Sequence, residues 1–325
     1  MFLLRRYTIM KKLFFVTLMT LLVSNLLIAN PSETRDSVVP RTFEYVRYGD
    51  KALMMDVYSP AVARADSACV VYIFGGGFVI GSRTEKSIRA LCQTLASRGF
   101  TAVAIDYRLH LQEVNYDTVS LFNMQGVFRQ AINKAATDAS AAVAYICAHA
   151  SEWGVSPSRI VLSGSSAGAI TALQVDYSRC NSLPPAAALP AGWAPAAVVS
   201  YAGGIFTEHS RPKYATPPAP TFFMHGDSDK IVNYKKFPPV IRTGLYGSKK
   251  LHRHFEKKGY PHWFFVFEGL GHEVASLHNY MYEEFEAFVN KALRQRQMHY
   301  DATVRDNQLK PTKWSKMNVF DLYKK

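Results

Sequence analysis

Residues 159–174 read "RIVLSGSSAGAITALQ", and this stretch decides the fold. Its first half is continuously apolar and rich in β-branched residues, which is typical of a strand buried on both faces of a parallel sheet. Its second half, after Ser166, predicts a helix. Between them lies a GxSxG turn at residues 164–168, where small residues let strand and helix approach closely. The pattern therefore predicts an exposed Ser166 hydroxyl at a strand end.

The same alternation extends in both directions along the chain. Further buried strands are predicted at 69–75, 101–108, 196–204, 221–226 and 263–269. Helices are predicted between them at 85–99, 128–150, 247–259 and 279–295. Residues 43–49 and 52–60 alternate as antiparallel strands do, with a turn at Asp50 and Lys51. Together these patterns predict an α/β fold, a mostly parallel central sheet flanked by helices.

The amino terminus predicts export. Basic residues among the first 12 precede an apolar run from Leu13 to Ala29, as in a secretory signal peptide. An uncleaved membrane anchor at residues 13–29 is the alternative, because 17 residues lie at the lower edge of a bilayer span. The expected organisation is a signal peptide (1–29), one catalytic domain (30–297) and a basic tail (298–325). The mature protein would be periplasmic or secreted, or membrane-anchored in the alternative.

Composition and charge argue against a nucleic-acid partner. The chain has 325 residues, of which 48% are hydrophobic and 19% charged, and its formal charge is +13. Removing the four basic residues of the signal lowers this charge to +9. The remaining excess forms no patch or stripe, so no nucleic-acid partner is expected. The four cysteines lack metal-binding spacing and predict small buried side chains with at most one disulfide.

Candidate catalytic residues follow predicted strand ends. Asp227 and Asp229 come directly after the strand at 221–226, and His272 follows the strand at 263–269. A serine hydroxyl needs a base to take its proton and an acid to orient that base. Ser166, one of the two aspartates and His272 therefore form a candidate triad.

The glycine run Gly75–Gly77, after the strand at 69–75, has a separate role. A carbonyl under attack develops negative charge on oxygen, and backbone amides stabilise it. Glycines let the chain approach a substrate without a Cβ clash. The expected oxyanion-hole donors are the amides of Gly76, Gly77 and Ala167.

The other histidines are not expected to take part in catalysis. His252 and His254 lie in a basic helical stretch and are expected to face solvent, and His262 is expected in a loop. His225 is expected to support the turn that carries the acid. A metal site at these histidines would need acidic or cysteine neighbours, which the local sequence lacks, so no metal and no cofactor are expected.

These motifs resemble the bacterial carboxylesterases of the α/β-hydrolase superfamily, in particular the HGGG esterases related to hormone-sensitive lipase and the carbohydrate acetyl and feruloyl esterases. The matching stretches are "LMMDVYSP", "VYIFGGGFVIGS", "AVAIDYRL", "DASAAVAYI", "RIVLSGSSAGA", "HGDSDKIV" and "GLGHE", between residues 53 and 273. The resemblance implies that the HGxxDxxV aspartate, Asp229, is the catalytic acid. It also implies hydrolysis of short acyl esters on a small molecule or glycan.

One position departs from the family pattern. Phe74 stands where the HGGG histidine braces the oxyanion loop by hydrogen bonds. An apolar ring cannot do this, so Phe74 is predicted to pack into the core and hold the glycines by burial. Phe78 matches the family pattern.

Several questions are open from sequence. A prolyl-oligopeptidase-type peptidase shares this catalytic domain, although it usually carries a large propeller before it. A non-catalytic binding protein on a hydrolase scaffold is a second alternative. The irregular stretches at 109–125 and 178–195 are candidates for loops that shape the substrate pocket.

Overall fold

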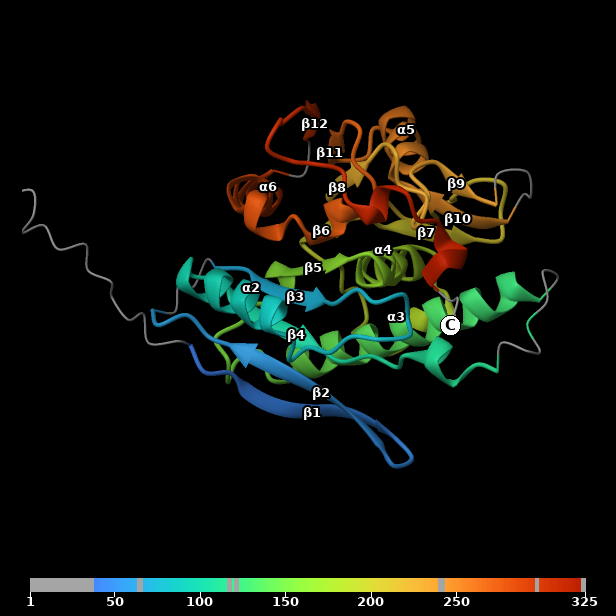
Figure 1. The fold of residues 1–325 in the computed structure, drawn as a ribbon. Coiled ribbons are helices and arrows are strands. Elements are labelled where there is room, and N and C mark those ends of the chain that lie inside the picture. The colour runs from blue at the N-terminus through green and yellow to red at the C-terminus, as the bar shows by residue number, and fades with distance from the viewer. Residues whose placement is uncertain are drawn as a thin grey trace, which may run out of the picture. The chain divides into compact units, whose positions relative to one another are not determined.

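Nine strands form one sheet in the order β1-β2-β4-β3-β5-β6-β8-β11-β12. Figure 1 shows them in this order, from β1 and β2 at the bottom to β12 at the top. The strands are β1 (Arg41–Tyr48), β2 (Lys51–Tyr58), β3 (Cys69–Ile73), β4 (Thr101–Ile105), β5 (Ile160–Ser165), β6 (Ala197–Tyr201), β8 (Thr221–Gly226), β11 (His262–Phe267) and β12 (His299–Val304). All pairs from β4 to β12 are parallel, and only β1–β2 and β2–β4 are antiparallel. The predicted α/β fold with a mostly parallel sheet is confirmed.

The computed structural model describes residues 38–62, 67–115, 119, 123–238, 243–295 and 298–322. The predicted signal peptide and the alternative anchor at residues 13–29 lie outside these ranges. Within them, no helix is long and apolar enough to cross a membrane.

In the described part of the chain, five α-helices connect the strands: α2 (Lys86–Ser97), α3 (Met124–Ala148), α4 (Ala167–Cys180), α5 (Ser248–Lys258) and α6 (Tyr282–Arg294). In α3, alanines at positions 131, 135, 139 and 142 are fully buried. Their small side chains form one face at helical spacing, so α3 packs closely on α4. At the end of α2, Arg98 forms ion pairs with Glu283 and Glu286 of α6.

The hairpin between β1 and β2 turns one residue earlier than predicted. Tyr48 pairs with Lys51, so the two turn residues are Gly49 and Asp50. Gly49 has a φ of +56°, a left-handed conformation that glycine adopts without a steric penalty. The sequence pattern located the hairpin, and the glycine fixed its register.

A second, three-stranded sheet was not predicted. It consists of β7 (Gly204–Thr207), β10 (Gly244–Gly247) and β9 (Lys236–Phe237), in that order. The stretch at 196–204 therefore ends in β6, and β7 starts a different sheet. These strands are only two to four residues long, too short to show a hydrophobic period.

The carboxyl-terminal segment is not a separate tail. Residues 299–304 form β12, which pairs in parallel with β11 at the edge of the main sheet. The predicted boundary at residue 297 is thus wrong, because the sheet continues beyond it. An edge strand is partly solvated, so its sequence "HYDATV" is too polar to stand out as a strand.

The lengths of the irregular stretches change, and the cysteines are mostly buried, as predicted. Helix α4 extends to Cys180 and α3 begins at Met124, so both irregular stretches are shorter than expected. All four cysteines are free thiols, and three of them are buried.

Candidate active site

The GxSxG turn forms the strand-to-helix elbow that the sequence predicts. Ser166 lies between β5 and α4 with φ 52° and ψ −119°, a strained conformation for a residue with a side chain. The flanking glycines are required by close packing. A Cβ on Gly168 would lie 2.0 Å from the carbonyl oxygen of Ile73, and one on Gly164 would lie 2.5 Å from Gly168. Strand β3 therefore abuts the elbow and fixes the position of Ser166.

The structure brings together the three residues of the candidate triad. The Ser166 hydroxyl lies 2.7 Å from Nε2 of His272, and Nδ1 of His272 lies 2.8 Å from Oδ2 of Asp229. A carboxylate can only accept, so Nδ1 carries the proton and Nε2 keeps its lone pair toward the serine. The three residues are 9%, 8% and 3% exposed, in the order Ser166, His272 and Asp229. This geometry allows His272 to take the hydroxyl proton.

Asp229 is held as an anion by its neighbours. Its Oδ1 accepts hydrogen bonds from the amides of Ile231 and Val232, and its Oδ2 faces His272 and His225. Burial alone would raise the pKa of this carboxyl. The adjacent imidazole of His272 and the hydrogen bonds from His225 and His272 outweigh burial and hold the pKa well below its usual value.

Asp227, the alternative candidate for the catalytic acid, makes its hydrogen bonds away from His272. Its Oδ1 accepts hydrogen bonds from the amide of Gly269 and the hydroxyl of Ser228, and both contacts are solvent-exposed. Of the two aspartates, the hydrogen bond to His272 belongs to Asp229, in agreement with the HGxxDxxV pattern.

His225 supports the turn that carries Asp229, as predicted. Its Nε2 lies 2.8 Å from the carbonyl oxygen of Val232, and its Nδ1 lies 2.7 Å from the hydroxyl of Ser248 at the start of α5. Since a carbonyl only accepts, Nε2 is the protonated nitrogen. From the end of β8, His225 therefore contacts both the acid-bearing turn, at Val232, and the start of α5, at Ser248.

The glycine loop lies directly beside the nucleophile. A Cβ on Gly75 would lie 3.3 Å from the Ser166 Cβ. Gly76 and Gly77 have φ values of +109° and +63°, and a Cβ on Gly76 would collide with the carbonyl of Ile80 at 1.9 Å. Ala167 begins α4, where the first amides of a helix have no intrahelical acceptor. Of the predicted oxyanion-hole residues, Ala167 thus directly follows Ser166, and Gly76 and Gly77 directly follow Gly75, which lies beside it.

Phe74 is buried, as predicted, and the partner that holds it was not foreseen. The ring is 3% exposed and stacks on Tyr107, with 4.5 Å between ring centroids. The Tyr107 hydroxyl donates to the carbonyl oxygens of Phe74 and Gly75, at 3.0 and 3.2 Å. Hydrogen bonds therefore do hold the glycine loop in place. Their donor is Tyr107, in the segment after β4, and not a side chain at position 74.

Residues on both sides of Tyr107 fix that segment. Asp106 forms an ion pair of 2.6 Å with Arg83, which follows the glycine loop. Arg108 forms an ion pair of 2.7 Å with the fully buried Asp138 of α3 and also donates to it through its backbone amide. The stretch "DYR" at 106–108 lies within a motif that carried the family resemblance, but its sequence alone gives no contact partner.

A second group of missed residues comes from the carboxyl-terminal segment. The Ser315 hydroxyl accepts from the amide of Gly271, next to His272, and donates to Glu273. Asn318 forms a β-bridge with Lys230, which follows Asp229. The segment predicted to be a tail therefore contacts the loops that carry both the acid and the histidine.

Two of the histidine predictions are wrong. His252 and His262 are buried, at 6% and 0% exposure, and lie 3.1 Å apart through Nδ1 and Nε2. His262 is the first residue of β11 rather than a loop residue, and His252 stacks on Phe264. Burial lowers the pKa of both imidazoles below the usual value. The acidic neighbour that the local sequence lacked is Asp301 of β12.

A cleft of about 530 Å³ lies between α3, α4 and the second sheet. The irregular stretch at 178–195 contributes four residues to its lining, Asn181, Leu183, Pro184 and Pro185. Arg129 and Glu208 form an ion pair at this cleft.

Known protein sequences match part of this chain. A sequence model of the family described as BD-FAE matches residues 55–183. The isoprenylcysteine alpha-carbonyl methylesterase of Arabidopsis thaliana is 32% identical over 123 residues, which are 38% of this chain and 24% of that protein. Lipase 2 of Moraxella sp. (strain TA144) is 34% identical over 111 residues, 34% of this chain and 21% of that protein. The chain thus spans about a quarter of the length of these curated relatives.

Solved structures match over more of the chain. The apo form of Thermogutta terrifontis esterase 2 superposes with a TM-score of 0.54 at 21% identity, covering 82% of this chain and 95% of that one. The same esterase phosphoramylated by tabun gives a TM-score of 0.54 at 21% identity, covering 79% and 98%. This likeness shows the α/β-hydrolase fold.

The fold is that of the α/β-hydrolases, and it places a serine-histidine-aspartate arrangement at the carboxyl ends of the strands. Within that superfamily the chain resembles the bacterial carboxylesterases, as its motifs indicated. The relatives named above are described as a methylesterase, a lipase and an esterase.

Proposed function

We propose that this protein is an exported serine esterase that cleaves short acyl esters through an acyl-enzyme. The observation that carries the proposal is the unbroken chain of hydrogen bonds from Ser166 through His272 to Asp229, at 2.7 and 2.8 Å. A strained serine at an elbow, a neutral imidazole aimed at it and a buried carboxylate behind the imidazole are the parts that nucleophilic acyl transfer needs.

The reaction follows from this geometry. Ser166 Oγ attacks the ester carbonyl while its proton passes to Nε2 of His272. The resulting oxyanion is stabilised by the amides of Gly76, Gly77 and Ala167. The intermediate collapses, the alcohol leaves with the proton from His272, and the acyl group remains on Ser166. Water, deprotonated by His272, then releases the acid and restores the serine. No metal or organic cofactor takes part in these steps.

The substrate class is a finer proposal. Resemblance to the carbohydrate acetyl and feruloyl esterases supports acetyl- or feruloyl-type esters on glycans. Thermogutta terrifontis esterase 2 has been solved with propionate and with butyrate bound, which makes short acids the first series to test here. The basic, apolar amino terminus supports export to the periplasm or beyond.

The test compares substrates of each candidate class on one protein. Acetylated xylan, a feruloylated sugar, p-nitrophenyl esters from acetyl to octanoyl and an aminoacyl p-nitroanilide are assayed with the wild type and with Ser166→Ala. We expect turnover to be highest on the short esters and to be lost in Ser166→Ala. Ser158→Ala, which changes an exposed serine just before the amino end of β5, is the matched control and should retain full activity.

Three outcomes would count against the proposal. Preference for the anilide would favour the prolyl-oligopeptidase-type peptidase. If Ser166→Ala retained turnover, Ser166 would not be the nucleophile. Folded wild type that neither hydrolyses any ester nor reacts with a fluorophosphonate probe would favour a non-catalytic binding protein.

A further inference from the structure

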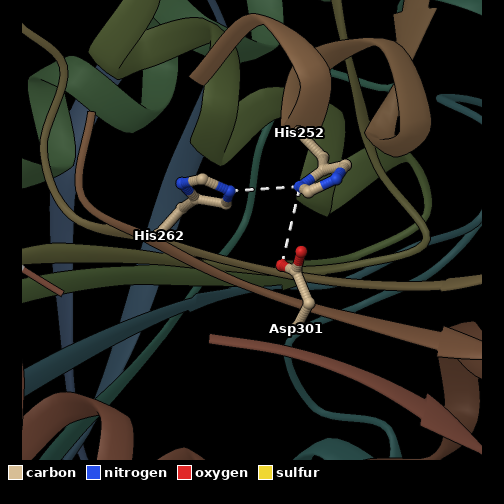
Figure 2. A group of neighbouring side chains, drawn as sticks. All are labelled: His252, His262 and Asp301. Carbon is tan, nitrogen blue, oxygen red and sulfur yellow. Dashed lines mark hydrogen bonds and ion pairs between the residues drawn. The ribbon is translucent and has the colours of Figure 1, made fainter. Parts of the chain in front are cut away.

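A second cluster of histidine and aspartate lies at the end of β11 opposite to His272. It consists of His252 on α5, His262 at the start of β11 and Asp301 on β12 (Figure 2). In a strand, residues two apart share a face, so His262 and Phe264 lie on the same face of β11. Asp301 pairs in register with Phe264, and the His252 ring stacks on Phe264. The register of β12 therefore brings the three groups together.

Their donor atoms converge on one point. Nδ1 of His252 lies 3.1 Å from Nε2 of His262 and 3.6 Å from Oδ1 of Asp301, and all three donor atoms lie within 4.8 Å of one another. Figure 2 shows both contacts meeting at the same nitrogen of His252. In a tetrahedral zinc site with bonds of about 2.0 to 2.1 Å, neighbouring ligand atoms are about 3.3 Å apart. The two spacings from His252, 3.1 and 3.6 Å, lie close to that value.

The imidazoles of His252 and His262 can also direct a lone pair toward the centre of the cluster. Nδ1 of His262 lies 2.8 Å from the carbonyl oxygen of Tyr260 and must donate to it, so Nε2 carries a lone pair toward the cluster. This is the contact by which metal-bound histidines are usually oriented. On His252, Nε2 lies 3.9 Å from Oε2 of Glu256, so the ring proton can move from Nδ1 to Nε2 and face a carboxylate. Both imidazoles can thus present a lone pair at once.

We propose that His252, His262 and Asp301 form a binding site for a divalent zinc ion. Two imidazoles and one carboxylate are a donor set that suits zinc, and the 41% exposed Asp301 side chain leaves room for water as a fourth ligand. His299, whose Nε2 lies 3.5 Å from the other oxygen of Asp301, orients that carboxylate.

The ion has a structural role. It joins α5 through His252 to the paired strands β11 and β12, in addition to the His252–His262 hydrogen bond and the stacking of His252 on Phe264. The six residues of β11 span about 20 Å between this cluster and the catalytic end of the strand. Zinc is therefore expected to raise the thermal stability and leave turnover unchanged.

The test uses the full chain without a histidine tag. The protein is stripped with a chelator, dialysed against Zn²⁺ and analysed by inductively coupled plasma mass spectrometry, by competition with a chromophoric chelator and by thermal melting. Asp301→Asn is the main variant, because an exposed isosteric change at a sheet edge preserves folding. Asp306→Asn makes the same charge change five residues further on, outside the cluster, and is the matched control.

We expect one zinc per chain in the wild type and in Asp306→Asn, with an increase in Tm on zinc addition. Asp301→Asn should bind zinc at least about tenfold more weakly and lose that increase. Visible absorption typical of tetrahedral Co²⁺, present in the wild type and absent in Asp301→Asn, would place the ion at this cluster. The proposal is overturned if the wild type binds less than stoichiometric zinc, or if Asp301→Asn binds it as tightly as the wild type. His262→Gln, checked for folding by circular dichroism, gives an independent second test with the same expected loss.

Discussion

Two histidine–aspartate clusters lie at opposite ends of strand β11, and they use the same chemical groups differently. At the carboxyl end, His225 and His272 face Asp229. At the amino end, His252 and His262 lie against Asp301. Residue type alone does not distinguish the two sites.

The direction of the lone pairs makes the difference. At Asp229 both histidines present an N–H: His225 Nε2 also faces the Val232 carbonyl, and His272 turns its lone pair away, toward Ser166. At the other end, the Tyr260 carbonyl holds the His262 proton outside the cluster. The first arrangement orients a base toward a nucleophile, and the second collects donor atoms around one point. Hydrogen bonds to backbone carbonyls thus decide which chemistry a histidine–aspartate cluster supports.

The largest effect is expected at His272, the proposed catalytic base. His272→Gln removes the group that takes the Ser166 proton, and kcat should fall by about 10⁶-fold, as when a serine-type base is removed elsewhere. Stopped assays on p-nitrophenyl acetate measure this change in kcat. His262→Gln makes the same exchange at the other end of β11 and should leave kcat unchanged in folded protein. Equal losses in the two variants would erase the proposed distinction between the clusters.

The next effect separates the two aspartates. Asp229→Asn keeps the shape of the site but favours the wrong tautomer of His272, so kcat should fall by about 10⁴-fold. Asp301→Asn should have the kcat of the wild type. Michaelis–Menten kinetics on one ester substrate compare the pair. A small loss in Asp229→Asn would mean that another acid orients the histidine.

Acid sensitivity of folding should also depend on Asp229. Its pKa is lowered in the folded state, so its contribution to stability is complete above the unfolded value of about 3.9 and is lost as the pH falls below it. The difference in free energy of unfolding between wild type and Asp229→Asn should therefore narrow below about pH 4. Urea titrations at several pH values measure this difference. A difference that stays constant with pH would contradict the lowered pKa.

A smaller effect tests the brace of the oxyanion loop. Tyr107→Phe removes the hydroxyl that donates to Phe74 and Gly75 but keeps the stacked ring, and kcat should fall by about tenfold with little change in KM. Tyr177→Phe removes another buried hydroxyl, which contacts Thr207, and is the control. If both variants lose the same activity, the loss reflects general destabilisation rather than the loop.

The smallest effect is expected at the carboxyl-terminal segment. Ser315→Ala removes the acceptor of the Gly271 amide and the donor to Glu273, so His272 should be held less firmly and kcat should fall by about threefold. Ser97→Ala, a surface serine on α2, is the control. An unchanged kcat in Ser315→Ala would show that the segment only covers the loop.

The sequence by itself determined the features that depend on neighbours along the chain. The hydrophobic periods located the helices and every strand of the main sheet except the polar edge strand β12. The GxSxG turn, the glycine run, Asp229 and His272 each follow a buried strand directly, and parallel strands bring their carboxyl ends to one edge. That is why a local pattern sufficed to collect the candidate triad.

Only the tertiary structure decided the contacts made across the sheet. Tyr107 braces Phe74 because β3 and β4 are adjacent, with Ile73 beside Ile105. Ser315 reaches Gly271, and Asp301 reaches His252, because β12 joins the sheet in a register that a polar edge strand does not reveal. The partners in these contacts lie from about 30 to 50 residues apart, and their separation in space is set by strand order and register, which no local pattern encodes.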